Sequence, residues 1–243
     1  MKTAIRITLF ALLPTVCLAT TWCPVDKECP FCGTVSTYYE IMSYGSYIYE
    51  YPSKYEYIFW PFIEGKILFC CKKCWFTAYS WDFDSIPQGK KPGIKKILDK
   101  LAVWETNGAY TVVPMYYRLK IAEEIYKLYG RNDEFWCHFY RVKGYHLEIE
   151  EKFQEAAEAR RKAIEIAERM IENKHNEGIY KELLYITGAM KYKLDDEQGA
   201  LQDFKKAQQL VYQKSGMDKI SQDNINDFLN RLLDDYLEKL KPE

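Results

Sequence analysis

The stretch ILFCCKKCWFTAYSWDF, residues 67–83, contains three cysteines within five positions. Two of them, Cys71 and Cys74, have C-x-x-C spacing, and the same spacing recurs upstream at Cys29 and Cys32 in CPFCG. A chain that turns between two such thiols can direct both sulfur atoms toward one ion. Two pairs brought together by the intervening segment predict a four-thiolate zinc site, which is closed and structural rather than catalytic.

Residues 20–87, which contain both pairs, are rich in aromatic residues that alternate as in β-strands. The run YYEIMSYGSYIYEYPSKYEYIFW, residues 38–60, consists largely of aromatic and isoleucine residues, interrupted by Gly45 and Pro52. Such a pattern indicates a few short antiparallel strands. We therefore predict a small zinc-ribbon-like β module. Its tyrosines are expected to pack between strands and form an exposed rim, or alternatively to make a carbohydrate- or peptide-binding surface.

The chain becomes helical in pattern after PQGKKPG, residues 87–93, which has the composition of a linker. Asp133 and Asp196 are expected N-caps, and Gly130 is an expected C-cap. The predicted fold class is α+β, mostly α, with the β module followed by a helical domain over residues 94–243. The predicted helices span 94–104, 114–129, 133–149, 151–173, 178–193, 197–213 and 221–240.

Small residues recur at equal offsets in the helical part. Offsets of 12, 16 and 19 residues lead from Gly188 to Ala200, Phe204 and Ala207, and from Gly144 to Ala156, Arg160 and Ala163. Small residues at these positions allow two antiparallel helices to approach closely. The pattern resembles the tetratricopeptide repeat, which implies helical hairpins with a groove for a peptide or helix of another protein. The alternative is a plain helical bundle in which these small residues coincide by chance.

The N-terminus has the form of a secretory signal peptide. Lys2 and Arg6 precede an apolar run, and we expect cleavage after Ala19, so that residues 1–19 are removed. The alternatives are a retained N-terminal anchor and lipid attachment at Cys17. Because no second apolar run of spanning length follows, we predict no membrane span, and a location in the periplasm or cell envelope.

Export changes how the remaining cysteines are interpreted, because oxidising compartments favour disulfides. The two C-x-x-C pairs can form two intramolecular disulfides instead of binding zinc. Cys23 and Cys70 each lie just before a pair, and we hypothesise a disulfide between them. The alternative is that Cys70 replaces Cys71 as a ligand. Cys137 is expected to be a buried, small apolar residue.

The order of these motifs resembles a bacterial family of uncharacterised proteins that carry domain of unknown function 2225. That family shows a C-P-x-C-G turn, an apolar strand entering a second such turn, and then an alanine and an Asp-Phe pair. This chain departs from the pattern at Lys72, which replaces proline, and at Trp75, which replaces glycine, so we expect a distorted second turn. The resemblance implies the zinc ligands Cys29, Cys32, Cys71 and Cys74, followed by the motif residues Ala78, Asp82 and Phe83. No reaction is established for the family.

Composition and motifs favour a non-enzymatic function. The formal net charge is −1, which argues against nucleic acid as a partner. The sequence contains no HExxH, G-x-S-x-G, P-loop or G-x-G-x-x-G motif. His138 and His146 lie eight residues apart and suggest either a second metal site or ordinary histidines on the surface or in the seam between repeats. We expect an exported protein-interaction or scaffold module, with a thiol-disulfide oxidoreductase that uses CPFC as the alternative.

Overall fold

The computed structural model describes residues 21–43, 65–101, 109–174 and 176–241. The predicted signal peptide, Cys17 and most of the tyrosine-rich run lie outside these residues. The strands are β1 (Thr21–Glu28), β2 (Val35–Ser43), β3 (Leu68–Cys70) and β4 (Thr77–Tyr79). The α-helices are α1 (Lys91–Leu98), α2 (Met115–Lys127), α3 (Asp133–Ile149), α4 (Phe153–Glu172), α5 (Tyr180–Tyr192), α6 (Glu197–Gln208) and α7 (Lys219–Lys239). Two short 3₁₀ helices span Tyr110–Val112 and Glu177–Ile179.

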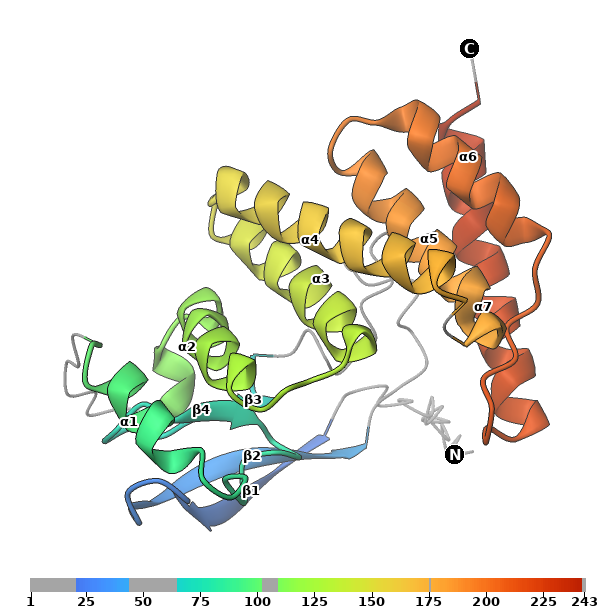
Figure 1. The fold of residues 1–243 in the computed structure, drawn as a ribbon. Helices are drawn as coiled ribbons and strands as arrows, with labels where there is room; N and C mark the ends of the chain where they lie inside the picture. Colours follow the sequence, from blue (N-terminus) through green and yellow to red (C-terminus); the bar gives the residue numbers. More distant parts are fainter. Residues whose placement is uncertain (1–20, 44–64, 102–108, 175, 242–243) are drawn as a thin grey trace, which may run out of the picture.

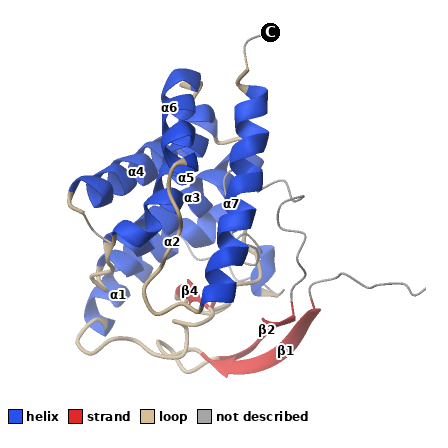
Figure 2. Cartoon of the chain, turned by 90° about the vertical axis from the view of Figure 1, so that its right-hand side faces the viewer, coloured by secondary structure: helices blue, strands red, loops and turns tan. Residues whose placement is uncertain are grey.

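The strands gather at one end of the molecule, and the helices form the rest (Figures 1 and 2). β1 pairs with β2, and β3 pairs with β4, both antiparallel. α2 lies against β3 and β4. One helical hairpin consists of α3 and α4, and a second consists of α5 and α6; α7 packs against the second hairpin. The predicted class, α+β and mostly α, is confirmed.

An aromatic cluster joins the two pairs of strands. The ring of Tyr38 on β2 stacks on that of Phe69 on β3, with 4.6 Å between centroids. Phe83 and Tyr110 lie 4.9 and 5.0 Å from the Tyr38 ring. All four side chains are buried. Because two-stranded sheets have little core of their own, this cluster supplies the apolar contact that holds them together.

Tyr126 of α2 connects the strands to the helices. Its hydroxyl accepts a hydrogen bond from the Tyr79 backbone N–H of β4 at 2.9 Å and donates one to Asp82 at 3.0 Å. Asp82 also pairs with Arg131, which follows α2, at 2.5 Å. The chain that leaves β4 is therefore attached to α2 by directed bonds, in addition to apolar packing.

The helix boundaries agree with the sequence predictions in part. The bounds predicted for α3 are confirmed, whereas α1 begins at Lys91, inside the predicted linker, with Pro92 in its first turn. α6 ends at Gln208 instead of residue 213. The predicted N-cap Asp196 is confirmed, because its carboxylate accepts from the Gly199 N–H at 2.9 Å. Asp133 is not a cap: Asn132 accepts from the Phe135 N–H at 3.0 Å.

The small residues of the predicted repeat lie where paired helices touch. A Cβ atom added at Gly188 on α5 would stand 2.5 Å from Cε1 of Phe204 on α6. One added at Gly144 on α3 would stand 3.1 Å from Cγ of Arg160 on α4. The close approach predicted for both hairpins is therefore confirmed, although a tightly packed helical pair does not by itself define a repeat family.

We expect Gly188→Ala to destabilise the protein by about 1–3 kcal/mol, because its methyl group would overlap the Phe204 ring. That ring is buried and stacked on Tyr236 at 4.5 Å, so it has no room to move. Urea denaturation measures the effect.

Gly144→Ala is the matched control, because its added methyl group would meet Cγ of Arg160 at 3.1 Å, a tight contact rather than an overlap. Its expected cost is smaller, since alanine is favoured over glycine by roughly 1 kcal/mol inside a helix. Equal effects at the two glycines would contradict this account of the Gly188 contact.

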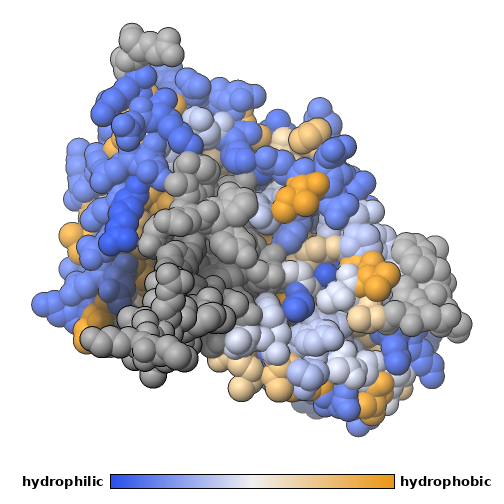
Figure 3. Space-filling view, turned by 180° about the vertical axis from the view of Figure 1, so that it is seen from behind, coloured by the Kyte–Doolittle hydropathy of each residue, from blue (hydrophilic) through white to orange (hydrophobic). Residues whose placement is uncertain are grey.

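On the face shown in Figure 3, the described surface is largely hydrophilic, with hydrophobic side chains scattered among polar ones. Among the described residues, none of the helices combines the length and apolar character needed to cross a membrane.

Candidate metal centre

The first cysteine pair occupies the turn between β1 and β2. Cys29 follows the last residue of β1, and its backbone N–H donates to the Thr34 carbonyl at 3.0 Å. The Gly33 N–H donates back to the Cys29 carbonyl at 2.9 Å. Gly33 has φ +76°, a left-handed conformation that glycine adopts without a steric penalty. The first pair thus stands in a tight turn that two backbone hydrogen bonds close.

The second pair repeats this turn without a glycine. The Cys71 N–H donates to the Phe76 carbonyl at 2.9 Å, and the Trp75 N–H donates to the Cys71 carbonyl at 2.8 Å. Trp75 takes φ +64°, in the region expected for the glycine that it replaces. The distortion expected for this turn is not observed, because both backbone hydrogen bonds match those of the first pair. The Trp75 side chain is fully buried, edge-on to Tyr117 at 5.5 Å.

The two turns bring all four predicted ligands together. The sulfur atoms of Cys29, Cys32, Cys71 and Cys74 lie within 4.8 Å of one another. The Cys29–Cys74 and Cys32–Cys71 sulfur separations are each 3.6 Å. Zinc–sulfur bonds of ~2.3 Å in a tetrahedron imply sulfur separations of ~3.8 Å. The donor set and its spacing therefore fit one tetrahedral thiolate-bound ion, of which zinc and iron are the usual examples.

The thiols of the cluster change one another's pKa values. Hydrogen bonds from the Cys29 and Cys74 thiols hold the pKa of Cys71 far below its ordinary value. The same contacts raise the pKa of Cys29, through Cys71, and that of Cys74, through Cys29. One thiolate is thus stabilised by its neighbours even before an ion binds. Four thiolates on one divalent ion carry a charge of −2, which the exposed Lys72 and Lys73 offset in part.

Arg118 of α2 fixes the strand that leads into the second pair. The residue is 2% exposed, and its guanidinium donates to the carbonyls of Val113 at 2.9 Å, of Leu68 at 2.6 Å and of Gly65. Burial lowers the pKa of Arg118 to about 10, which leaves it charged at neutral pH. The role of Arg118 is not predictable from the sequence, because nothing in the helical pattern around it distinguishes it from an exposed arginine.

The other cysteines lie outside the four-sulfur cluster. Cys23 and Cys70, for which we hypothesised a disulfide, are both free thiols in the structure. Cys23 is half-buried on β1, with its sulfur 3.6 Å from the Pro24 carbonyl, while Cys70 is buried on β3. Cys71, not Cys70, belongs to the cluster. Cys137 is 1% exposed, as predicted.

His138 and His146 do not form a metal site with other ligands. The guanidinium of Arg141 bonds to Nδ1 of His138 at 2.6 Å, and Glu182 lies 3.8 Å from its Nε2. His146 packs edge-on against Tyr145. Within the part of the chain that the structure describes, the four cysteines are the sole cluster with metal-ligand geometry.

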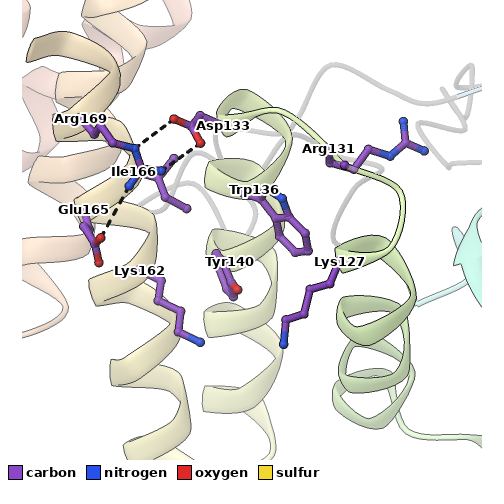
Figure 4. A pocket seen from close by; sticks show the side chains of 10 residues that line it. Lys127, Arg131, Asp133, Trp136, Tyr140, Lys162, Glu165, Ile166 and Arg169 are labelled. Atoms are coloured by element: carbon purple, nitrogen blue, oxygen red, sulfur yellow. Dashed lines mark hydrogen bonds and ion pairs between the residues drawn. The ribbon is translucent and has the colours of Figure 1, made fainter. Parts of the chain in front are cut away.

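A shallow pocket of about 370 Å³ opens between α2, α3 and α4, with the rings of Trp136 and Tyr140 at its centre (Figure 4). Arg169 at its edge pairs with Asp133 at 2.9 Å, and Lys127 pairs with Glu124. Arg169 and Lys127 are thus each paired with a carboxylate of the same surface.

The position of CPFC bears on the oxidoreductase alternative. In that class of enzyme, a helix N-terminus lowers the pKa of the attacking thiol. Here Cys29 and Cys32 stand in a turn between two strands instead. The first pair thus lacks the helix that activates such a thiol.

The distances between the sulfur atoms, the matched turns and the surrounding aromatic residues define a candidate structural metal centre. Comparison with protein-family models, with curated proteins and with solved structures finds no match for this chain. The resemblance to the family of domain of unknown function 2225 therefore stays a prediction.

Proposed function

We propose that this protein is a non-enzymatic interaction module, exported to the periplasm or cell envelope, in which a structural zinc ion fastens the β module to a scaffold of helices. The observation that carries the zinc site is the convergence of two distant thiol pairs. Four sulfur atoms lie within 4.8 Å of one another, from turns about forty residues apart in the sequence.

The arrangement around the sulfurs supports a structural role. All four positions of a tetrahedron are supplied by protein thiols, so an ion here has no open position for water or substrate. The two strand pairs have little core of their own, and an ion that cross-links their turns would contribute folding free energy directly.

The helices support the scaffold part of the proposal. Two hairpins with glycine at their contacts pack side by side, in the manner of helical repeat proteins that bind peptides or helices of other proteins. The proposed partner is another protein or peptide in the groove of these hairpins, rather than nucleic acid.

Metal analysis of the protein purified from its native compartment tests the zinc site. We expect one zinc per chain by mass spectrometry, and Cys29, Cys32, Cys71 and Cys74 unreactive toward thiol reagents until a chelator removes the metal. Iron in place of zinc would give a coloured protein. Disulfides within the cluster, together with reductase activity, would instead support the oxidoreductase alternative.

A further inference from the structure

The Thr34 side chain contacts a sulfur atom of the proposed metal centre. Thr34 stands at the end of the first turn, and its carbonyl accepts the hydrogen bond from the Cys29 N–H that closes this turn. The Thr34 hydroxyl oxygen lies 3.3 Å from the sulfur atom of Cys32. Because threonine is branched at Cβ, few rotamers are open to it, and the backbone bond holds the residue in place. The hydroxyl is therefore kept beside this sulfur.

The second turn has no equivalent hydroxyl. Its closing bond runs from the Cys71 N–H to the Phe76 carbonyl, so Phe76 occupies the position that Thr34 has in the first turn. The Phe76 side chain is an apolar ring and is fully buried. The second turn instead carries Lys72 and Lys73, whereas the first turn has no charged side chain. The two pairs of thiols therefore lie in different polar surroundings.

The direction of the hydrogen bond between Thr34 and Cys32 depends on the state of the sulfur. In the metal-free chain the thiol donates to the hydroxyl oxygen. A metal-bound cysteine is a thiolate, which has no proton and can only accept. A threonine hydroxyl can donate as well as accept, so the bond can reverse without movement of the heavy atoms. Because hydrogen bonds to charged acceptors are roughly twice as strong as those between neutral groups, the contact gains strength when an ion binds.

We propose that the Thr34 hydroxyl donates a hydrogen bond to the metal-bound thiolate of Cys32 and thereby strengthens zinc binding. Thr34 is then a positioning residue, which orients the Cys32 sulfur and stabilises part of the negative charge of the four-thiolate centre. This inference rests on the proposed zinc site and states how one of its ligands is held.

Thr34→Val in the full chain tests the proposal, because valine keeps the branched shape of threonine and removes the hydroxyl. We expect zinc binding to weaken about 10-fold, measured by competition with a chromogenic chelator. In the Co²⁺ form, we expect the sulfur-to-cobalt charge-transfer bands to move to longer wavelength. The reason is that the hydrogen bond lowers the energy of the sulfur electrons that this transition transfers to the metal.

Two further variants serve as controls. Thr34→Ser keeps a hydroxyl beside the sulfur, so its zinc affinity and cobalt bands should match those of the wild type. Thr37→Val removes a hydroxyl that donates to Asp26 on the paired strand at 2.7 Å, instead of contacting a sulfur. Its zinc affinity is expected to stay within about twofold of that of the wild type, with unchanged bands.

The proposal requires both changes in Thr34→Val. Weaker zinc binding with unmoved cobalt bands would mean that the hydroxyl acts on the turn and not on the sulfur, and would overturn the proposal. Unchanged affinity would also overturn it, as would an equal loss in Thr34→Ser or in Thr37→Val. In all these cases the wild type would still bind zinc, and the proposed function would stand. A wild type that binds neither zinc nor cobalt would overturn the proposed function, and this inference with it.

Discussion

Replacing Cys71 by serine is expected to abolish stoichiometric zinc binding and to unfold the strands. Serine is a poor zinc ligand, and three remaining thiols leave the shell open. Structural zinc sites contribute on the order of 10 kcal/mol of binding free energy, which small β modules need in order to fold. Zinc analysis and thermal melting followed by circular dichroism measure the result.

Helices α3–α7 should keep their structure in this variant, because they pack mainly on one another. α2 is expected to loosen, since Tyr126 contacts β4 directly. Cys23→Ser is the matched control, because Cys23 lies outside the cluster, and it should retain one zinc and wild-type melting. Retention of zinc with an unchanged melting curve in Cys71→Ser would contradict the proposed centre.

Replacing Arg118 by methionine is expected to destabilise the protein by about 3–5 kcal/mol. Methionine fills much of the same volume, but it leaves three carbonyl groups without a donor in a buried environment. Two of these groups belong to Gly65 and Leu68, at the start of the segment that carries the second turn. We therefore expect weaker zinc binding as well as a lower urea midpoint.

Lys120→Met on the same helix is the control, because Lys120 is exposed and its change should stay within about 0.5 kcal/mol. Arg118→Lys should rescue only part of the loss, since an ammonium group cannot reproduce the planar fork of donors. Full rescue by lysine would show that charge alone, rather than directed bonding, is what Arg118 supplies.

The metal centre was predictable from the sequence because its ligands stand in local pairs. C-x-x-C spacing places two sulfur atoms within one turn. If both pairs bind one ion, the chain between them must fold so that the two turns meet. Arg118 and Tyr126 were not predictable in this way. Arg118 donates to the carbonyls of Gly65 and Leu68, which lie 53 and 50 residues away in the sequence. The spacing of residues within a helix does not predict contacts over such separations.

Helix positions were predictable from periodicity, but some ends were not. Asn132 and Asp133 are adjacent and can both act as N-caps, so only the local backbone geometry decides between them. α6 stops at Gln208, although helix-compatible residues continue to 213. The residues after α6 instead contact the short 3₁₀ helix that precedes α5: the Gln213 N–H donates to the Gly178 carbonyl at 2.7 Å.

The buried indole of Trp75 opposes replacement of this residue by glycine, although glycine would suit the backbone of the second turn better. A left-handed backbone at a non-glycine residue costs roughly 1–2 kcal/mol. Loss of a buried tryptophan side chain costs about 3–5 kcal/mol. Trp75→Gly would relax the backbone but leave a cavity beside Tyr117, and because the lost packing outweighs the relieved strain, we expect the change to be destabilising.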